Sequence, residues 1–236
     1  PRFAKYEKFS DIIQNITASP TSSFFADTVN KNFISALEQT EQLGTLMEEV
    51  SLETSFSTED INAQLMQIAK VIKLSSVLGL ERAGFLTLMR NFDSHGSFDT
   101  DTASKFANLN QALDKFHTEM VAQGSWDQVV IVIMSEFGRT ISSNGAGTDH
   151  GWGGNYVLMG GGLDGGKILG QYPDQLGAGG ELDLGRGIIL PTTPWEAPWT
   201  GLAEWMGVES EDMNEVLPNL ENFDDSSIFH EETLFE

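Results

Sequence analysis

The stretch VVIVIM, residues 129–134, is an unbroken apolar run in which every residue except Met134 is β-branched. Such a run is typical of a strand buried on both faces, as in a parallel sheet covered by helices. It follows residues 101–123, where apolar side chains recur every three or four positions up to Gly124, a pattern that predicts a long amphipathic helix. Residues 85–89 (FLTLM) predict an earlier strand. This order predicts an α/β fold with a mostly parallel central sheet flanked by helices.

The rest of the chain extends this prediction without dividing it. No internal repeat and no Ser/Pro-rich linker interrupts the sequence, so we expect a single α/β domain over residues 1–236 that ends in an acidic tail, 224–236. Further predicted elements are helices within 5–50 and at 61–72 and 197–206, and short strands at 156–159 and 167–169.

Composition excludes several classes of function. The 236 residues include 13 Lys and Arg against 35 Asp and Glu, a net charge of −22, whereas a nucleic-acid binder needs a cationic footprint. The absence of cysteine excludes disulfides, thiolate zinc sites and cysteine nucleophiles. No apolar run is long enough to predict a membrane span. The stretch after Gly187 has no Lys or Arg, which favours the solvated acidic surface of a salt-adapted or exported protein, a surface that is open to protein partners.

Polar residues that can hold a metal follow both predicted strands and recur in the Gly-rich region beyond them. In open α/β sheets, sites form outside the carboxyl ends of the strands. Carboxylates combined with imidazoles suit a divalent cation such as zinc, manganese or calcium. The candidate metal ligands are Asp93, His95, Glu136, Asp149 and His150.

Arg139 is the candidate catalytic residue, because its guanidinium can hold an anion bidentately while the ion polarises a phosphoryl or sulfuryl oxygen. Simpler explanations stand beside each assignment. Asp93 and His95 lie in a stretch of ordinary turn residues, and Glu136 can form an internal ion pair with Arg139. His230 is expected to be structural or to have no role.

The combination of three motifs resembles the family catalogued as domain of unknown function 1501, a sulfatase-like family of the alkaline phosphatase superfamily. The motifs are FDSH at 92–95, SEFGRT at 135–140 and GTDHG at 147–151. The C-terminal part is also similar, and the resemblance covers roughly residues 60–223. It rests there on GRG at 185–187, LPTT at 190–193, WMGV at 205–208 and PNL at 218–220.

The resemblance implies an α/β sandwich of which this chain is the C-terminal portion, with the nucleophile upstream. It implies that Asp93 and His95 hold one ion and His150 another. Glu136 stands where the superfamily usually has an Asp-His pair, and Phe137 replaces the expected imidazole.

Two functions follow from these residues. The first is a metal-dependent hydrolase domain that acts on a phosphate or sulfate ester as its anionic substrate, with Arg139 on the anion. The second is a catalytically inactive sulfatase-like protein with a structural or assembly role.

Overall fold

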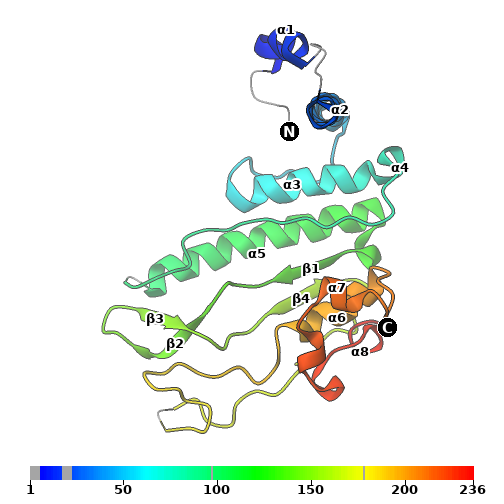
Figure 1. Ribbon diagram of the computed structural model, residues 1–236. Helices are drawn as coiled ribbons and strands as arrows, with labels where there is room; N and C mark the ends of the chain where they lie inside the picture. The colour runs from blue at the N-terminus through cyan, green and yellow to red at the C-terminus, as the bar shows by residue number, and fades with distance from the viewer. Residues whose placement is uncertain (1–5, 18–22, 97, 178) are drawn as a thin grey trace. The chain divides into compact units, whose positions relative to one another are not determined.

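The computed structural model describes residues 6–17, 23–96, 98–177 and 179–236 (Figure 1). The chain divides into two compact units, Pro1–Phe85 and Leu86–Glu236. None of the helices in the described ranges combines the length and the apolar character that crossing a membrane requires.

The first unit is built from helices, as predicted. Ser23 begins the second of them, because its hydroxyl accepts a hydrogen bond from the amide of Ala26 at 3.4 Å. At the other end, Lys70 donates to the carbonyl of Met47 at 2.7 Å and so satisfies a group that the end of a helix leaves without a partner. The helices are α1 (Tyr6–Thr17), α2 (Phe24–Glu49), α3 (Asp60–Lys73) and α4 (Ser75–Leu78).

The second unit opens with α5 (Phe98–Gln123), which confirms the predicted long helix. Gly124 ends it in the left-handed conformation, at φ 67°, and its amide donates to the carbonyl of Val121 at 3.0 Å. The elements that follow are η1 (Trp126–Gln128), β1 (Val130–Ile133), β2 (Gly138–Ser143), β3 (Thr148–Gly151), β4 (Val157–Gly160), α6 (Glu196–Trp205), α7 (Met213–Val216), η2 (Leu220–Asn222), η3 (Asp225–Ser227) and α8 (Glu231–Leu234).

The predicted fold class is wrong. Helices make up 47% of the structure, and its four strands form two separate antiparallel pairs, β1 with β4 and β2 with β3, with no large parallel sheet in the described ranges. β1 confirms a strand in the VVIVIM stretch, but its residues are half-buried rather than buried on both faces. Residues 85–89 and 167–169, both predicted strands, lie outside any strand. A β-branched run favours an extended backbone, whereas tertiary packing determines which strand pairs with it and whether the pair is parallel or antiparallel.

The acidic segment 224–236 packs against α6. Gly201 allows this approach, since its amide donates to the carbonyl of Phe229 at 2.8 Å and an added Cβ would lie 2.6 Å from that oxygen. Leu234 is buried, and the ring of Phe235 stacks on Trp205 with centroids 5.1 Å apart. The segment is therefore anchored by apolar contacts within the second unit.

Candidate metal centre

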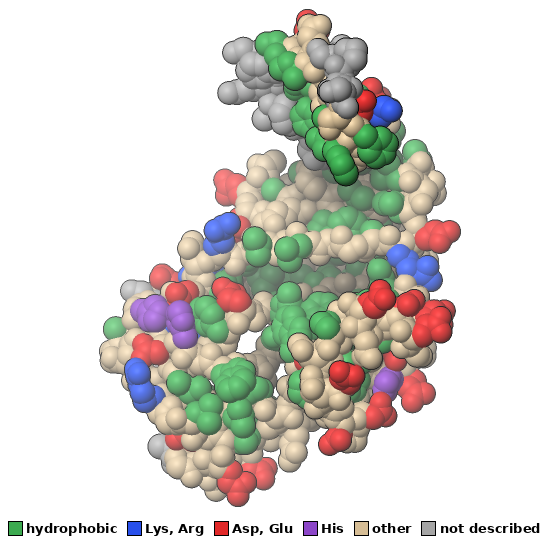
Figure 2. Space-filling view, in the orientation of Figure 1, with side chains coloured by type: hydrophobic (Ala, Val, Ile, Leu, Met, Phe, Trp, Pro, Cys, Tyr) green, Lys and Arg blue, Asp and Glu red, His purple; other side chains and the backbone are tan. Residues whose placement is uncertain are grey.

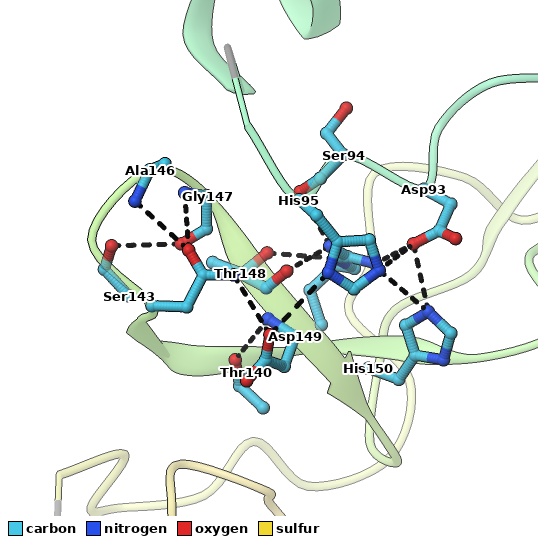
Figure 3. A network of polar contacts seen from close by, with 12 residues as sticks. Asp93, Ser94, His95, Thr140, Ser143, Ala146, Gly147, Thr148, Asp149 and His150 are labelled. Atoms are coloured by element: carbon cyan, nitrogen blue, oxygen red, sulfur yellow. Dashed lines mark hydrogen bonds and ion pairs between the residues drawn. The ribbon is translucent and has the colours of Figure 1, made fainter.

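Asp93 is the residue around which the candidate site is built (Figure 3). Its Oδ1 atom lies 3.0 Å from Nε2 of His95 and 3.0 Å from Nε2 of His150. The two imidazole nitrogens are 3.2 Å apart. One ligand atom from each side chain thus falls within 4.8 Å of the others, a spacing at which the three can hold one metal ion.

The cluster is open to solvent. The side chain of Asp93 is 48% exposed, and those of His95 and His150 are each 52% exposed. Figure 2 shows a group of histidine side chains on the molecular surface next to acidic side chains. A solute can therefore reach the three ligand atoms directly.

One carboxylate and two imidazoles form a donor set with a clear metal preference. Zinc accepts nitrogen and carboxylate oxygen together, and three protein ligands leave a coordination position open for water or substrate. The same composition also suits ferrous iron, whereas calcium prefers an all-oxygen shell. Of the metals expected from the sequence, the donor set favours zinc or manganese over calcium.

Arg139 fastens Asp93 to the neighbouring hairpin. Its Nη1 donates to Asp93 Oδ1 at 2.5 Å, and its Nη2 donates to the carbonyl of Ser94 at 2.7 Å. Its Nε donates to Oγ1 of Thr148 at 2.9 Å, and Nη2 also donates to the Thr148 carbonyl. The Arg139 hydrogen bond, followed by that of His150, lowers the pKa of Asp93, so the carboxylate stays ionised.

Asp149 lies behind His95, on the side of the imidazole that faces away from Asp93. Its Oδ1 is 3.7 Å from Nδ1 of His95 and accepts a hydrogen bond from Nδ2 of Asn144 at 3.0 Å. Its Oδ2 is 3.1 Å from Nη2 of Arg186. The Asn144 amide, and then the charge of Arg186, lower the pKa of this carboxyl. A carboxylate beside Nδ1 is the kind of partner that orients an imidazole whose Nε2 holds a metal.

The β2–β3 hairpin carries both Arg139, which we call the clamp because it holds Asp93, and the candidate ligand His150. Arg139 on β2 pairs directly with His150 on β3. Directly opposed residues in an antiparallel pair project from the same face of the sheet. Both side chains therefore reach Asp93 from one face of the hairpin.

The tip of this hairpin touches the loop that carries His95. Oδ1 of Asn144 accepts hydrogen bonds from the amides of Ala146 and Gly147, at 3.1 and 2.8 Å, which closes a tight turn. A Cβ built on Gly147 would lie only 2.7 Å from the carbonyl carbon of His95 and 2.8 Å from the carbonyl oxygen of Ser94. Glycine is required here because two backbones meet.

Phe137 and Glu136 lie at the margin of the site. The ring of Phe137 stacks on the imidazole of His150, with centroids 4.1 Å apart and planes 19° apart. The stacking therefore fixes the plane of the candidate ligand His150, so the aromatic residue that stands where the family resemblance implied an imidazole supports that ring. Glu136 is exposed and accepts a weak hydrogen bond from Ser135 at 3.4 Å, outside the group of three ligand atoms.

The structure thus brings together Asp93, His95 and His150 in one group, with Arg139 and Asp149 in contact with it. Sequence reasoning did not single out Asn144 or Arg186. The turn-forming string Asn-Gly-Ala-Gly at 144–147 is a signal that could have identified Asn144, whereas the Gly-Arg-Gly string at 185–187 enters only through the family resemblance.

Comparison with known proteins gives one match. Residues 78–179 match a family described as "Protein of unknown function (DUF1501)". Neither the curated proteins nor the solved structures gave a match to this chain. The matched range contains every ligand and clamp residue described above, so this part of the chain is similar to the DUF1501 family, as its three motifs indicated.

Proposed function

We propose that Asp93, His95 and His150 hold a divalent metal ion at a centre that hydrolyses phosphate or sulfate esters. The convergence of their three ligand atoms within 4.8 Å carries this proposal. Such an ion, when bound, polarises the ester oxygen and lowers the pKa of a bound water. The resemblance of the three motifs to a sulfatase-like family supports the ester as the substrate class.

The chain's own residues prepare this centre for a cation. Arg139 keeps Asp93 ionised and in place, and Asp149 lies beside Nδ1 of His95 so that Nε2 can face the ion. Ser94 is buried, and its carbonyl is held by Arg139, so this neighbouring hydroxyl is poorly placed to attack a substrate. We expect the nucleophile to be a water molecule bound at the metal.

The test is a zinc titration by calorimetry on the full-length protein. We expect one bound ion per chain in the wild type, and loss of binding in Asp93→Ala and in His150→Ala. His230→Ala is the matched control, since it removes a histidine that also contacts carboxylates but lies in a different cluster. Equal zinc content in the wild type and in both ligand variants would contradict the metal centre.

Hydrolysis is measured separately with p-nitrophenyl phosphate and p-nitrophenyl sulfate, after loading with zinc, manganese or ferrous iron. Turnover that Asp93→Ala abolishes supports the hydrolase. Tight metal binding without turnover of either ester would instead favour the inactive structural role.

A further inference from the structure

We propose that Arg186, rather than Arg139, binds the anionic group of the substrate beside this metal centre. This inference rests on the proposed function and names the residue that recognises its substrate. It assigns a ligand-binding role outside residues 78–179, the range that matches the family.

The guanidinium of Arg139 already uses most of its donors in hydrogen bonds within the protein. Its guanidinium makes four hydrogen bonds, to Asp93, to the carbonyl of Ser94, and to the hydroxyl and carbonyl of Thr148. Its side chain is only 19% exposed. A guanidinium has five N–H donors in a fixed fork, so these contacts leave too few for bidentate recognition of a phosphate or sulfate. Arg139 therefore positions Asp93 and does not bind the anion.

Arg186 has the opposite character. Its side chain is 81% exposed, and in the described part of the chain its guanidinium forms one ion pair, from Nη2 to Asp149 at 3.1 Å. Most of its donors thus face solvent, in the planar fork that matches two oxygens of a tetrahedral anion.

The backbone holds Arg186 at this place against its conformational preference. Its φ is 59°, between Gly185 at 94° and Gly187 at 78°, so a non-glycine residue occupies the left-handed region within a run of positive φ values. Gly187 fixes the run to β2, because its carbonyl accepts from the amide of Ile141 at 2.9 Å and an added Cβ would lie 2.6 Å from the amide nitrogen of Ser142. Strain of this kind is concentrated at functional sites, and here no burial of the arginine offsets it.

The contacts place Arg186 beside His95, on the far side of Asp149. Asp149 connects the two, since one carboxylate oxygen meets Arg186 and the other lies 3.7 Å from Nδ1 of His95. An anion drawn to this surface would find the exposed guanidinium of Arg186 separated from His95 only by the Asp149 carboxylate. Electrostatic attraction by Arg186 would then complement the metal without drawing on Arg139.

The experiment titrates the full-length protein with inorganic phosphate, and then with inorganic sulfate, in the presence and absence of zinc. We expect Arg186→Gln to weaken phosphate binding about 10- to 100-fold, the contribution of hydrogen bonds to a charged group. Arg186→Lys keeps the charge and loses the planar fork of donors. Its phosphate affinity should therefore lie between that of the wild type and that of Arg186→Gln. Zinc affinity should not fall in Arg186→Gln, because removing a nearby positive charge does not disfavour a cation.

Lys167→Gln is the matched control, because it also removes one basic group from an exposed ion pair, with Asp164. It should leave phosphate affinity unchanged. Phosphate affinity in Arg186→Gln equal to that of the wild type, or no phosphate binding by the zinc-loaded wild type, would overturn the inference. Failure of the wild type to bind zinc, manganese and ferrous iron would overturn the proposed function instead, so the two can be told apart.

Discussion

Two clusters in the second unit use the same residue types in opposite arrangements. At Asp93, one carboxylate oxygen lies between two imidazoles. At His230, one imidazole lies between two carboxylates, with Nδ1 2.8 Å from Glu204 and Nε2 3.0 Å from Asp225. The Glu204 hydrogen bond, followed by that of Asp225, raises the pKa of His230.

The difference shows that the arrangement of the imidazole nitrogens and carboxylates, more than the residue types, decides whether such a cluster can hold a metal ion. An imidazole that donates from both nitrogens is a cation with no lone pair for a metal, so His230 serves as an internal ion-pair partner. At Asp93, one possible ligand atom from each of three side chains lies within 4.8 Å of the others. At His230 the two carboxylates contact different nitrogens of one ring, so this cluster does not form such a group in the described residues.

Of the changes considered, we expect the largest loss of zinc affinity when a side chain is added at Gly147, where two backbone segments meet. In Gly147→Ala, the new Cβ would lie under 3.0 Å from backbone atoms of Ser94, His95 and Gly96, which cannot rotate away. We expect zinc affinity, measured by calorimetry, to fall about 10- to 100-fold, as for other changes around a metal ligand. The free energy of unfolding should fall by about 1–3 kcal/mol.

The control for this change is Gly96→Ala, which adds the same methyl group nearby. No atom lies within 4 Å of a Cβ at Gly96, so both zinc affinity and stability should stay close to wild type. If the two variants bind zinc equally well, the close approach at Gly147 does not organise the site.

Loosening the clamp should have a smaller effect. Arg139→Lys keeps a positive charge near Asp93 but replaces a fork that makes four hydrogen bonds with a single point charge. We expect zinc affinity to fall about tenfold, the lower end of the range for residues that orient a ligand. A purely structural clamp would lower the melting temperature and leave the zinc affinity of the folded protein unchanged. The exposed Arg90 supplies the control Arg90→Lys.

For the His230 cluster, we expect an effect of pH on the free energy of unfolding and no effect on metal binding. Because the folded state raises the pKa of His230, the stabilisation is fully present below the unfolded pKa, about 6.5, and is lost as pH rises through the folded value. We expect a contribution below about 1 kcal/mol, since both ion pairs are partly exposed.

Urea unfolding of the wild type and of His230→Gln between pH 5 and pH 9 would measure this contribution. The difference in unfolding free energy between the two proteins should shrink as pH rises, while zinc affinity stays the same in both. A difference that grows with pH would show that His230 is buried as the neutral form.

The sequence predicted local structure in the second unit better than it predicted how the strands pair. The helical period over 101–123 and the stop at Gly124 were sufficient to predict α5, because both signals are local. The VVIVIM run correctly predicted a strand but not its antiparallel partner β4, which lies more than twenty residues further along the chain. Residues 85–89 have strand-like composition without a ladder, since β structure depends on a neighbour that composition does not identify.

The candidate site shows the same limit. Three motifs named Asp93, His95 and His150, because their residue types are those of metal ligands, and the structure brings their ligand atoms together. The exposed Arg186 and its contact with Asp149 come from a Gly-rich region that has no hydrophobic period, so its path could not be read from a pattern. The hydrogen bonds that occupy the Arg139 guanidinium could not be predicted either, because they join loops that are far apart in the sequence.

The direct pairing of Arg139 with His150 has an evolutionary consequence. Side chains alternate between the faces of a strand, so a one-residue slip of β3 against β2 would move His150 to the face opposite Arg139 and away from Asp93. A lineage could therefore lose this centre through a single length change, with every ligand still present in its sequence. Among related chains, the spacing between the SEFGRT and GTDHG motifs should distinguish an intact centre from a lost one more reliably than the motifs themselves.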